Sequence, residues 1–128
     1  MRRLLDTNVL LWTVTSSRRL SKRTRALIED PATDVFYSAA SLWEIAIKAG
    51  FRRREFRIDV ETFHEALPEV GLAELPIRAG HAVAVTKLPD VHRDPFDRML
   101  VAQALIEPLV LLTNDEILAK YPATVRFA

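Results

Sequence analysis

Residues 94–115 read DPFDRMLVAQALIEPLVLLTND, and this stretch predicts a helix that leads directly into a buried strand. Asp94 and Pro95 form a strong helix start. An Asp side chain accepts hydrogen bonds from the free N–H groups of the first turn, and the fixed φ of proline suits that turn. The apolar run from Leu109 to Thr113 is typical of a strand that is covered on both faces. A helix followed by such a strand favours an α/β fold.

The rest of the chain repeats this alternation of strands and helices. We expect strands that end at Leu4-Leu5, span Val35–Ser38 and lie near Val125, with helices over Ser21–Glu29, Ala39–Ala49, Asp59–Leu67, Ile77–Lys87 and Asp94–Glu107, and a short helix from Asp115. Gly50 is expected to form a left-handed C-terminal cap, and Pro68 is expected to stop the helix before it. The predicted fold is a single α/β domain with a central parallel sheet flanked by helices on both faces.

The composition excludes several classes of site. No cysteine occurs among the 128 residues, which rules out disulfides, cysteine-ligated zinc, iron–sulfur clusters and thiol nucleophiles. The three glycines, Gly50, Gly71 and Gly80, are too far apart to build a glycine-rich phosphate loop. The length suits one domain with its own apolar core.

The first residues resemble a secretory signal only superficially. Two arginines precede an apolar run that reaches Val14, but Asp6 and Asn8 interrupt this run. A carboxylate is costly in the apolar segment of a signal peptide, and no clear small-residue cleavage pattern follows. No apolar run approaches the ~20 residues that a membrane span requires. We therefore expect a cytoplasmic protein with no membrane partner.

The charge is unevenly distributed along the chain. Residues 1–57 carry 12 basic and 6 acidic side chains, whereas residues 58–128 carry 6 and 11. The basic excess lies in two clusters, Arg18, Arg19, Lys22, Arg23 and Arg25, then Arg52, Arg53, Arg54 and Arg57. Such clusters are either solvated surface or a rim that contacts phosphates, and the second reading implies salt-sensitive binding.

Four carboxylates stand at positions that favour a shared site. Asp6 directly follows the first strand, Asp115 follows the strand that ends at Thr113, and Asp97 lies in the first turn of a helix. Each of these three also has a local explanation, as a turn residue, a helix cap or an acid near the positive end of a helix dipole. Glu44 lies among apolar neighbours, where a carboxylate must be paired, exposed at an edge or bound to a cation.

Together, the four positions indicate a metal site. If the strands before Asp6 and Asp115 are neighbours, their carboxylates converge at the carboxyl edge of the sheet, where ligands bind in folds of this class. Four negative charges in one cleft would raise one another's pKa values unless a cation were present. Oxygen ligands select hard cations such as Mg²⁺ or Mn²⁺, and an ion with open positions suits hydrolysis of a phosphodiester.

Four segments resemble the signature blocks of a known family. LLDTNVLLW at 4–12, SLWEIAIKAG at 41–50, HRDPFDRMLVAQAL at 92–105 and LLTNDE at 111–116 look like the blocks of PIN-domain ribonucleases, and more narrowly of VapC-type toxins from bacterial type II toxin–antitoxin pairs. The blocks occur in the family's order and span nearly the whole chain.

The resemblance implies that residues 1–128 form one PIN domain, a metal-dependent endoribonuclease that acts as a toxin. It implies that Asp6, Glu44, Asp97 and Asp115 are the acidic quartet that binds Mg²⁺ or Mn²⁺. Asp6 and Asp97 would be the principal ligands, and Glu44 and Asp115 would complete the site and position the attacking water. The same resemblance makes RNA the substrate, and the candidate RNA-binding residues are Arg18, Arg19, Lys22, Arg52, Arg53 and Arg54.

Several neighbours of the quartet also have candidate roles. Asn8 and Thr113 either orient the carboxylates or are ordinary turn and strand-end residues. Asp94 precedes Asp97 by three residues on nearly the same helix face, and we interpret Asp94 as the helix cap and Asp97 as the ligand. Arg98 could contact an RNA phosphate or pair with a neighbouring carboxylate, and we favour the pairing.

The three histidines carry no catalytic role in this interpretation. His92 is assigned to the loop before the helix that starts at Asp94, although it lies beside the acidic block. His64 and His81 lie in helical patterns, where core or surface placement is the default.

The resemblance also implies partners. Toxins of this type form homodimers and are neutralised by a small VapB-type antitoxin, whose C-terminal segment wraps the toxin and reaches the acidic cleft, in heterotetramers or larger assemblies. The alternative function is a catalytically silent PIN-like module that binds RNA or a partner. A phosphoacceptor domain is disfavoured, because such a domain needs a lysine after a late strand and Leu109–Asp115 contains none.

Overall fold

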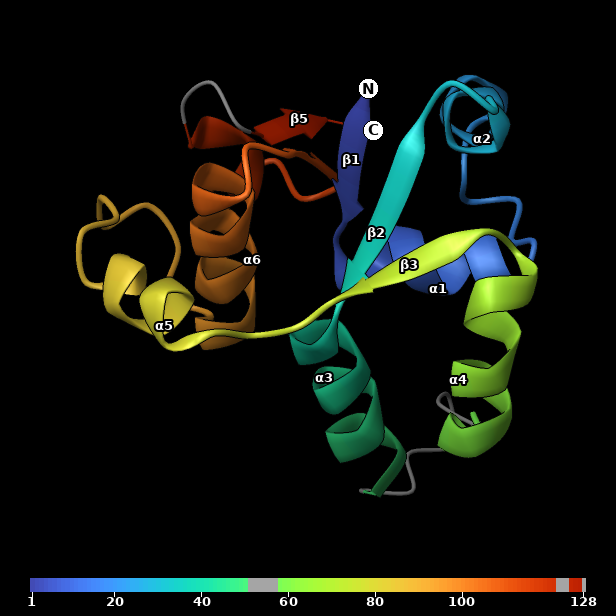
Figure 1. Ribbon diagram of the computed structural model, residues 1–128, viewed down its shortest axis with the longest axis horizontal. Helices are drawn as coiled ribbons and strands as arrows, with labels where there is room; N and C mark the ends of the chain where they lie inside the picture. The colour runs from blue at the N-terminus through green and yellow to red at the C-terminus, as the bar shows by residue number, and fades with distance from the viewer. Residues whose placement is uncertain (51–57, 122–124, 128) are drawn as a thin grey trace.

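A five-stranded parallel sheet forms the centre of the molecule (Figure 1). The computed structural model describes residues 1–50, 58–121 and 125–127. The strand order is β3-β2-β1-β4-β5, and every neighbouring pair is parallel. The strands are β1 Arg2–Leu5, β2 Asp34–Ser38, β3 Leu72–Leu75, β4 Val110–Thr113 and β5 Val125–Phe127. The predicted α/β fold with a central parallel sheet is confirmed, and β1 is its middle strand.

Helices cover both faces of this sheet, as predicted. The helices are α1 Thr7–Val14, α2 Lys22–Glu29, α3 Ala39–Gly50, α4 Val60–Glu69, α5 Ala79–Val85 and α6 Pro95–Ile106, with a 3₁₀ helix, η1, at Leu118–Lys120. In Figure 1, α5 and α6 lie on one side of the sheet, and α1, α2 and α4 lie on the other. No helix among the described residues is long and apolar enough to cross a membrane.

Alternation along the strands divides the core into two clusters. Leu4 packs with Leu100 and Leu111 in the cluster that includes α6, whereas Leu5 packs with Val9 and Leu112 in the cluster that includes α1. This follows from the strand geometry, because successive side chains point to opposite faces of a sheet. The middle strand is therefore buried on both faces, and its carboxyl end leads directly to Asp6.

Some local expectations were wrong. Gly50 is the last residue of α3 without a positive φ, and the glycine with a left-handed φ, of 82°, is Gly71 in the turn before β3. Pro68 lies inside α4, because a proline in the last turn removes only one of the final hydrogen bonds and the helix continues to Glu69. Helix α1 and strand β3 were not among the predicted elements.

Candidate metal centre at the carboxyl ends of β1 and β4

Asp6 lies at the junction of β1, β4 and α1. Its backbone N–H donates to Leu112 O at 3.0 Å, which continues the pairing of the two strands by one residue. Its Oδ1 accepts from the Val9 N–H at 2.8 Å and so caps α1, while its Oδ2 accepts from the Thr113 hydroxyl. Burial raises the pKa of Asp6 to about 6, against the lowering effect of these two hydrogen bonds. The carboxylate is fixed in orientation and costly to ionise.

Asp115 lies two residues beyond the end of β4. Its backbone N–H donates to the Thr113 hydroxyl oxygen at 3.0 Å, and its Oδ1 accepts from the Ile117 N–H at 2.8 Å. Partial burial raises the pKa of Asp115, but hydrogen bonds from His92 and from backbone N–H groups outweigh this and hold it below the usual value. Asp115 is therefore more readily ionised than Asp6 or Asp97, and Thr113 links it to Asp6.

Asp94 and Asp97, at the start of α6, make different contacts. Asp94 is the helix cap that the sequence predicts, because its Oδ1 accepts from the Phe96 N–H at 2.8 Å and from the Asp97 N–H at 3.4 Å. The Asp97 carboxylate makes no such backbone contact, and its Oδ2 lies 3.3 Å from His92 Nε2. Burial raises the pKa of Asp97 to about 7, and the negative charges of Asp94, Glu44 and Asp6 add to this shift, while His92 opposes it.

Glu44 reaches the same region from α3. Its Oε1 accepts from the Thr7 hydroxyl at 2.7 Å, and its Oε2 lies 3.0 Å from Lys48 Nζ, one helical turn later. The sequence left Glu44 to be paired, exposed at an edge or bound to a cation. In the structure it is paired with Lys48, and 13% of its side chain is exposed. Since Thr7 is the residue after Asp6, this hydrogen bond also ties α3 to the end of β1.

The structure brings these acids into one electrostatic group. Ligand atoms of His92, Asp97 and Asp115 all lie within 4.8 Å of one another. Asp6 and Glu44 are close enough for their charges to raise the pKa of Asp97. Asp97 and Asp115 therefore form a compact group with His92, and Asp6 and Glu44 lie near enough to act on Asp97 through their charges.

His92 also belongs to this site, although the sequence predicted only a loop position for it. Its Nδ1 accepts from the Asp94 N–H at 3.0 Å, so the proton of the ring is on Nε2, which lies 3.0 Å from Asp115 Oδ2. The ring thus faces two carboxylates as a donor. The only sequence feature that pointed to His92 was its position directly before the Asp94-Pro95 helix start. Its contact with Asp115 joins residues 23 positions apart, and no local sequence pattern predicts it.

Asn114 is a second residue near the acids to which the sequence assigned no role. It lies between Thr113 and Asp115, and a hydrogen bond from its backbone lowers the pKa of Asp6. Its side-chain Oδ1 is buried and has no hydrogen-bond partner among the residues that the structure describes. A buried acceptor without a partner is uncommon in folded proteins.

Arg98 does not pair with a carboxylate, so that prediction was wrong. Its guanidinium donates to the backbone carbonyls of Val85 at 3.0 Å, His92 at 3.2 Å and Pro89 at 3.3 Å, and no acid lies within ion-pair distance in the described part of the chain. The backbone carbonyls of the segment before α6 accept these hydrogen bonds, so the N–H donors of the Arg98 guanidinium are satisfied without an acid. Arg98 therefore holds the loop that carries His92.

The remaining candidate residues that the structure describes form no hydrogen bond or ion pair with the four acids. Asn8 is exposed in the first turn of α1 and makes no side-chain hydrogen bond within the described ranges. The basic residues Arg18, Arg19 and Lys22 are exposed, while Arg52, Arg53 and Arg54 lie outside the described residues. Among the other histidines, His64 is exposed and His81 is buried, with its Nε2 2.5 Å from Glu107 Oε2.

The donor set fits a hard divalent cation. Two of the four carboxylates, Asp6 and Asp97, have pKa values raised to about 6 and 7, chiefly because burial disfavours their ionised forms and also because neighbouring carboxylates repel them. A bound cation reverses this penalty, and carboxylate oxygens are the ligands that Mg²⁺ and Mn²⁺ prefer. The residues that would hold such an ion are Asp6, Glu44, Asp97 and Asp115.

Comparison with known proteins supports the fold and gives a family. Similar folds occur in the crystal structures of VapBC2 from Rickettsia felis bound to a DNA fragment from their promoter (15% identity, TM-score 0.73, 99% of this chain and 98% of that chain) and of VapBC-1 from nontypeable Haemophilus influenzae (17% identity, TM-score 0.70, 100% and 97%). DNA-bound VapBC from Salmonella typhimurium is also similar (19% identity, TM-score 0.67, 100% and 97%). No curated protein sequence matches. The PIN domain family matches residues 3–123, and because this match covers nearly the whole chain, the protein belongs to the PIN domain family.

Proposed function

We propose that this PIN domain is a metal-dependent endoribonuclease that acts as the toxin of a type II toxin–antitoxin pair. The observation that carries the proposal is the Asp97 carboxylate, whose pKa is raised to about 7 by burial and by Asp94, Glu44 and Asp6. Perturbed carboxylates of this kind concentrate at functional sites. The same atoms are the ligands that a nuclease of the metal-dependent type requires.

In this proposal each carboxylate has a defined part. Asp6 and Asp97 are the principal ligands of Mg²⁺ or Mn²⁺, and Glu44 and Asp115 complete the site and position the attacking water. When bound, the ion supplies a Lewis acid for the phosphate and a water of lowered pKa. Thr113 orients Asp6 through its hydroxyl, which also accepts from Asp115.

Other residues hold this arrangement in place. The His92 Nε2–H lies 3.0 Å from Asp115 Oδ2 and 3.3 Å from Asp97 Oδ2, so it bridges acids that come from different elements. Arg98 fixes the loop of His92. Lys48 offsets the charge of Glu44 at 3.0 Å. Preorganised ligands of this type lower the cost of binding an ion and a substrate in productive geometry.

The proposed partners follow from the family and from the similar structures. VapBC complexes have the same fold at 15–19% identity, so we propose a VapB-type antitoxin for this chain, with a homodimer as the toxin form and a heterotetramer or larger assembly with the antitoxin. For RNA, the exposed Arg18, Arg19 and Lys22 are proposed phosphate contacts. The same role remains a prediction for Arg52, Arg53 and Arg54, which lie outside the described residues.

The test is cleavage of RNA by the purified protein with Mg²⁺, with Mn²⁺ and with EDTA. We expect endonucleolytic products with either ion and none with EDTA, and a loss of at least 100-fold in rate for Asp97→Asn. Asp90→Asn is the matched control, because Asp90 is exposed and outside the acidic group. RNA binding without metal-dependent cleavage would instead support the silent module.

A further inference from the structure

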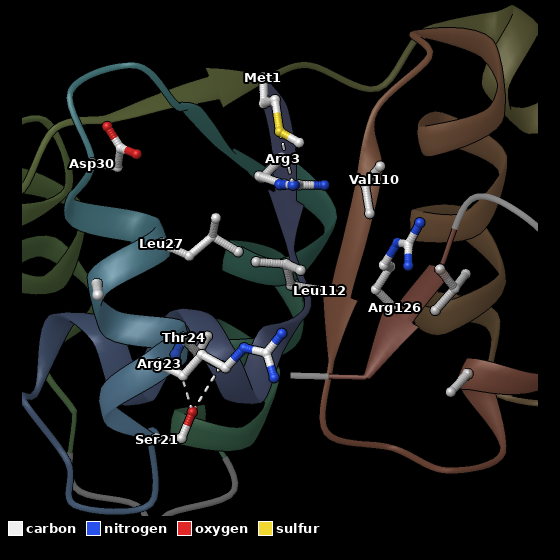
Figure 2. Close-up of a pocket in the computed structure, with 13 residues that line it drawn as sticks. Met1, Arg3, Ser21, Arg23, Thr24, Leu27, Asp30, Val110, Leu112 and Arg126 are labelled. Atoms are coloured by element: carbon white, nitrogen blue, oxygen red, sulfur yellow. Dashed lines mark hydrogen bonds between the residues drawn. The ribbon is translucent and has the colours of Figure 1, made fainter.

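A second site lies over β1, β4 and β5, beside α2. A cavity of about 1150 Å³ opens there, slightly larger than the roughly 300–1,000 Å³ that is common for ligand pockets (Figure 2). None of the four acids of the proposed metal centre lines it. The cavity therefore needs an explanation of its own, and that explanation does not depend on the proposed function.

Arg3 supplies a buried positive charge to this cavity. The residue is 8% exposed, and its Nη2 donates only to the thioether of Met1, at 3.2 Å. Its Nε is buried without a hydrogen-bond partner, and no carboxylate lies within ion-pair distance of it in the described part of the chain. An arginine stays protonated, and a buried charge without a counter-charge is strongly unfavourable. Among the residues that the structure describes, Arg3 thus lacks the anion that its environment requires.

The sheet register places a second guanidinium on the same face. Arg3 is paired with Val110 across β1 and β4, and Leu112 is paired with Arg126 across β4 and β5. Since β4 separates the two arginines, their strands are about 10 Å apart, a gap that two long side chains can close around one group. In Figure 2, Arg3 reaches into the space between α2 and β4, and Arg126 lies on the opposite side of that space.

The charge of the lining is strongly positive. Arg23 on α2 is the third arginine, and Figure 2 shows it reaching toward the same space. Asp30 is the single acid in the described lining, but its Oδ1 accepts from the Ala32 N–H at 2.9 Å and it forms no ion pair there. Three guanidinium groups and one already engaged carboxylate favour an anionic ligand.

The remaining walls are apolar. Leu27 of α2 and Val110 and Leu112 of β4 form the surface between the arginines. A bare, strongly hydrated anion gains nothing from such walls, whereas an anion attached to an aliphatic chain buries that chain at about 25 cal/mol per Å². The planar fork of a guanidinium matches a carboxylate with two parallel hydrogen bonds.

We propose that this cavity binds a carboxylate carried on an apolar chain, with Arg3 as its buried partner and Arg23 and Arg126 at its rim. Such a group occurs in a free aliphatic acid and at the C-terminus of a peptide that ends in an aliphatic residue. The two sources share one chemistry, and the experiment separates them.

The test is a titration of the ¹⁵N-labelled full chain, followed through the backbone N–H signals of Val110 and Leu112. The probes are hexanoate, hexan-1-ol, inorganic phosphate, and acetyl-Ala-Leu-Leu with either a free or an amidated C-terminus. We expect saturable shifts with hexanoate, with the free-acid peptide or with both, and at least tenfold weaker binding of hexan-1-ol and of the amidated peptide. Hexanoate alone identifies a free acid as the source, and the free-acid peptide alone identifies a chain terminus.

Variants complete the design. Arg3→Met keeps an unbranched apolar stem without the charge, and it should weaken binding at least tenfold, while Arg19→Met, at an exposed arginine outside the cavity, should not. If Arg3→Met does not fold, Arg23→Met and Arg126→Met replace it, each with an expected loss of about threefold. Unchanged binding in these variants, equal binding of phosphate, or no binding of either carboxylate at millimolar concentration overturns the proposal.

Discussion

The Thr113 hydroxyl donates a hydrogen bond to Asp6 Oδ2, and so joins the end of β4 to the end of β1 inside the acidic site. Because the same oxygen accepts from the Asp115 N–H at 3.0 Å, one hydroxyl positions two of the proposed ligands. We expect Thr113→Val to lower Mn²⁺ affinity about 10- to 100-fold, the usual effect of removing a group that orients a ligand. Isothermal titration calorimetry measures it. Thr113→Ser keeps the hydroxyl and should retain most of the affinity, so an equal loss in both variants would argue against this role.

Asp94 and Asp97 should respond differently to replacement by asparagine. Asparagine caps a helix about as well as aspartate, so Asp94→Asn should leave the free energy of unfolding nearly unchanged and reduce Mn²⁺ affinity only modestly. Asp97→Asn removes a proposed ligand and should reduce that affinity by at least tenfold. Titration of Mn²⁺ followed by water-proton relaxation compares the two, and a larger loss for Asp94→Asn would reverse the assignment.

The metal-free protein should lose stability as the pH rises. The folded-state pKa of Asp97 is about 7 and that of Asp6 about 6, against 3.8 for an ordinary Asp. Raised values mean that the folded state holds protons that the unfolded state has released, so this contribution is complete below about pH 4 and is lost as the pH passes 7. The lowered pKa of Asp115 acts in the opposite direction, but only at acidic pH.

Urea unfolding in EDTA at pH 5 and pH 8 tests this. We expect the free energy of unfolding to fall by roughly 2–4 kcal/mol between the two values, with a smaller fall in Asp97→Asn. Asp90→Asn should behave as the unmodified chain does. Adding Mn²⁺ at pH 8 should restore stability, because the ion binds the ionised carboxylates. A free energy that rises with pH in EDTA would contradict the prediction.

His92→Gln should raise the pKa of Asp115, since the hydrogen bond from His92 Nε2 holds it down. The pKa of Asp97 should rise as well, because His92 lowers it. Carboxyl ¹³C chemical shifts followed through a pH titration report both groups. His64→Gln is the control, because His64 is exposed and makes no contact with the site. If both variants give the same titration curves, His92 does not act on these acids.

The sequence predicts those parts of the fold that have strong local signals. The Asp94-Pro95 start of α6, the Ser21 cap of α2 and the apolar run of β4 lie where they were expected. Strand β3, Leu72–Leu75, was missed because four residues between Gly71 and Pro76 carry little periodicity, and its pairing with β2 is a tertiary contact. Helix α1, Thr7–Val14, was missed because it is apolar over most of its length, so that beyond Asp6 and Asn8 it continues the composition of β1 with little helical periodicity.

The candidate site was predictable as a set of acids but not as a network. The positions of Asp6 and Asp115 after strands follow from the topology of parallel sheets. The contact between His92 and Asp115 and the inward carbonyls around Arg98 depend on how separate segments meet, and no pattern within either segment encodes them. Arg3 likewise reads as an ordinary flanking charge until the sheet buries it.

The Asp6 carboxylate has two roles, and only a suitable substitution separates them. Asp6 is a proposed metal ligand and also begins α1 by accepting from the Val9 N–H. Alanine at this position would remove both functions, whereas asparagine preserves the helix start while losing the negative charge. An inactive Asp6→Ala protein would therefore be ambiguous between lost chemistry and a frayed helix. Asp6→Asn is the form in which an inactive protein can be used as a substrate trap.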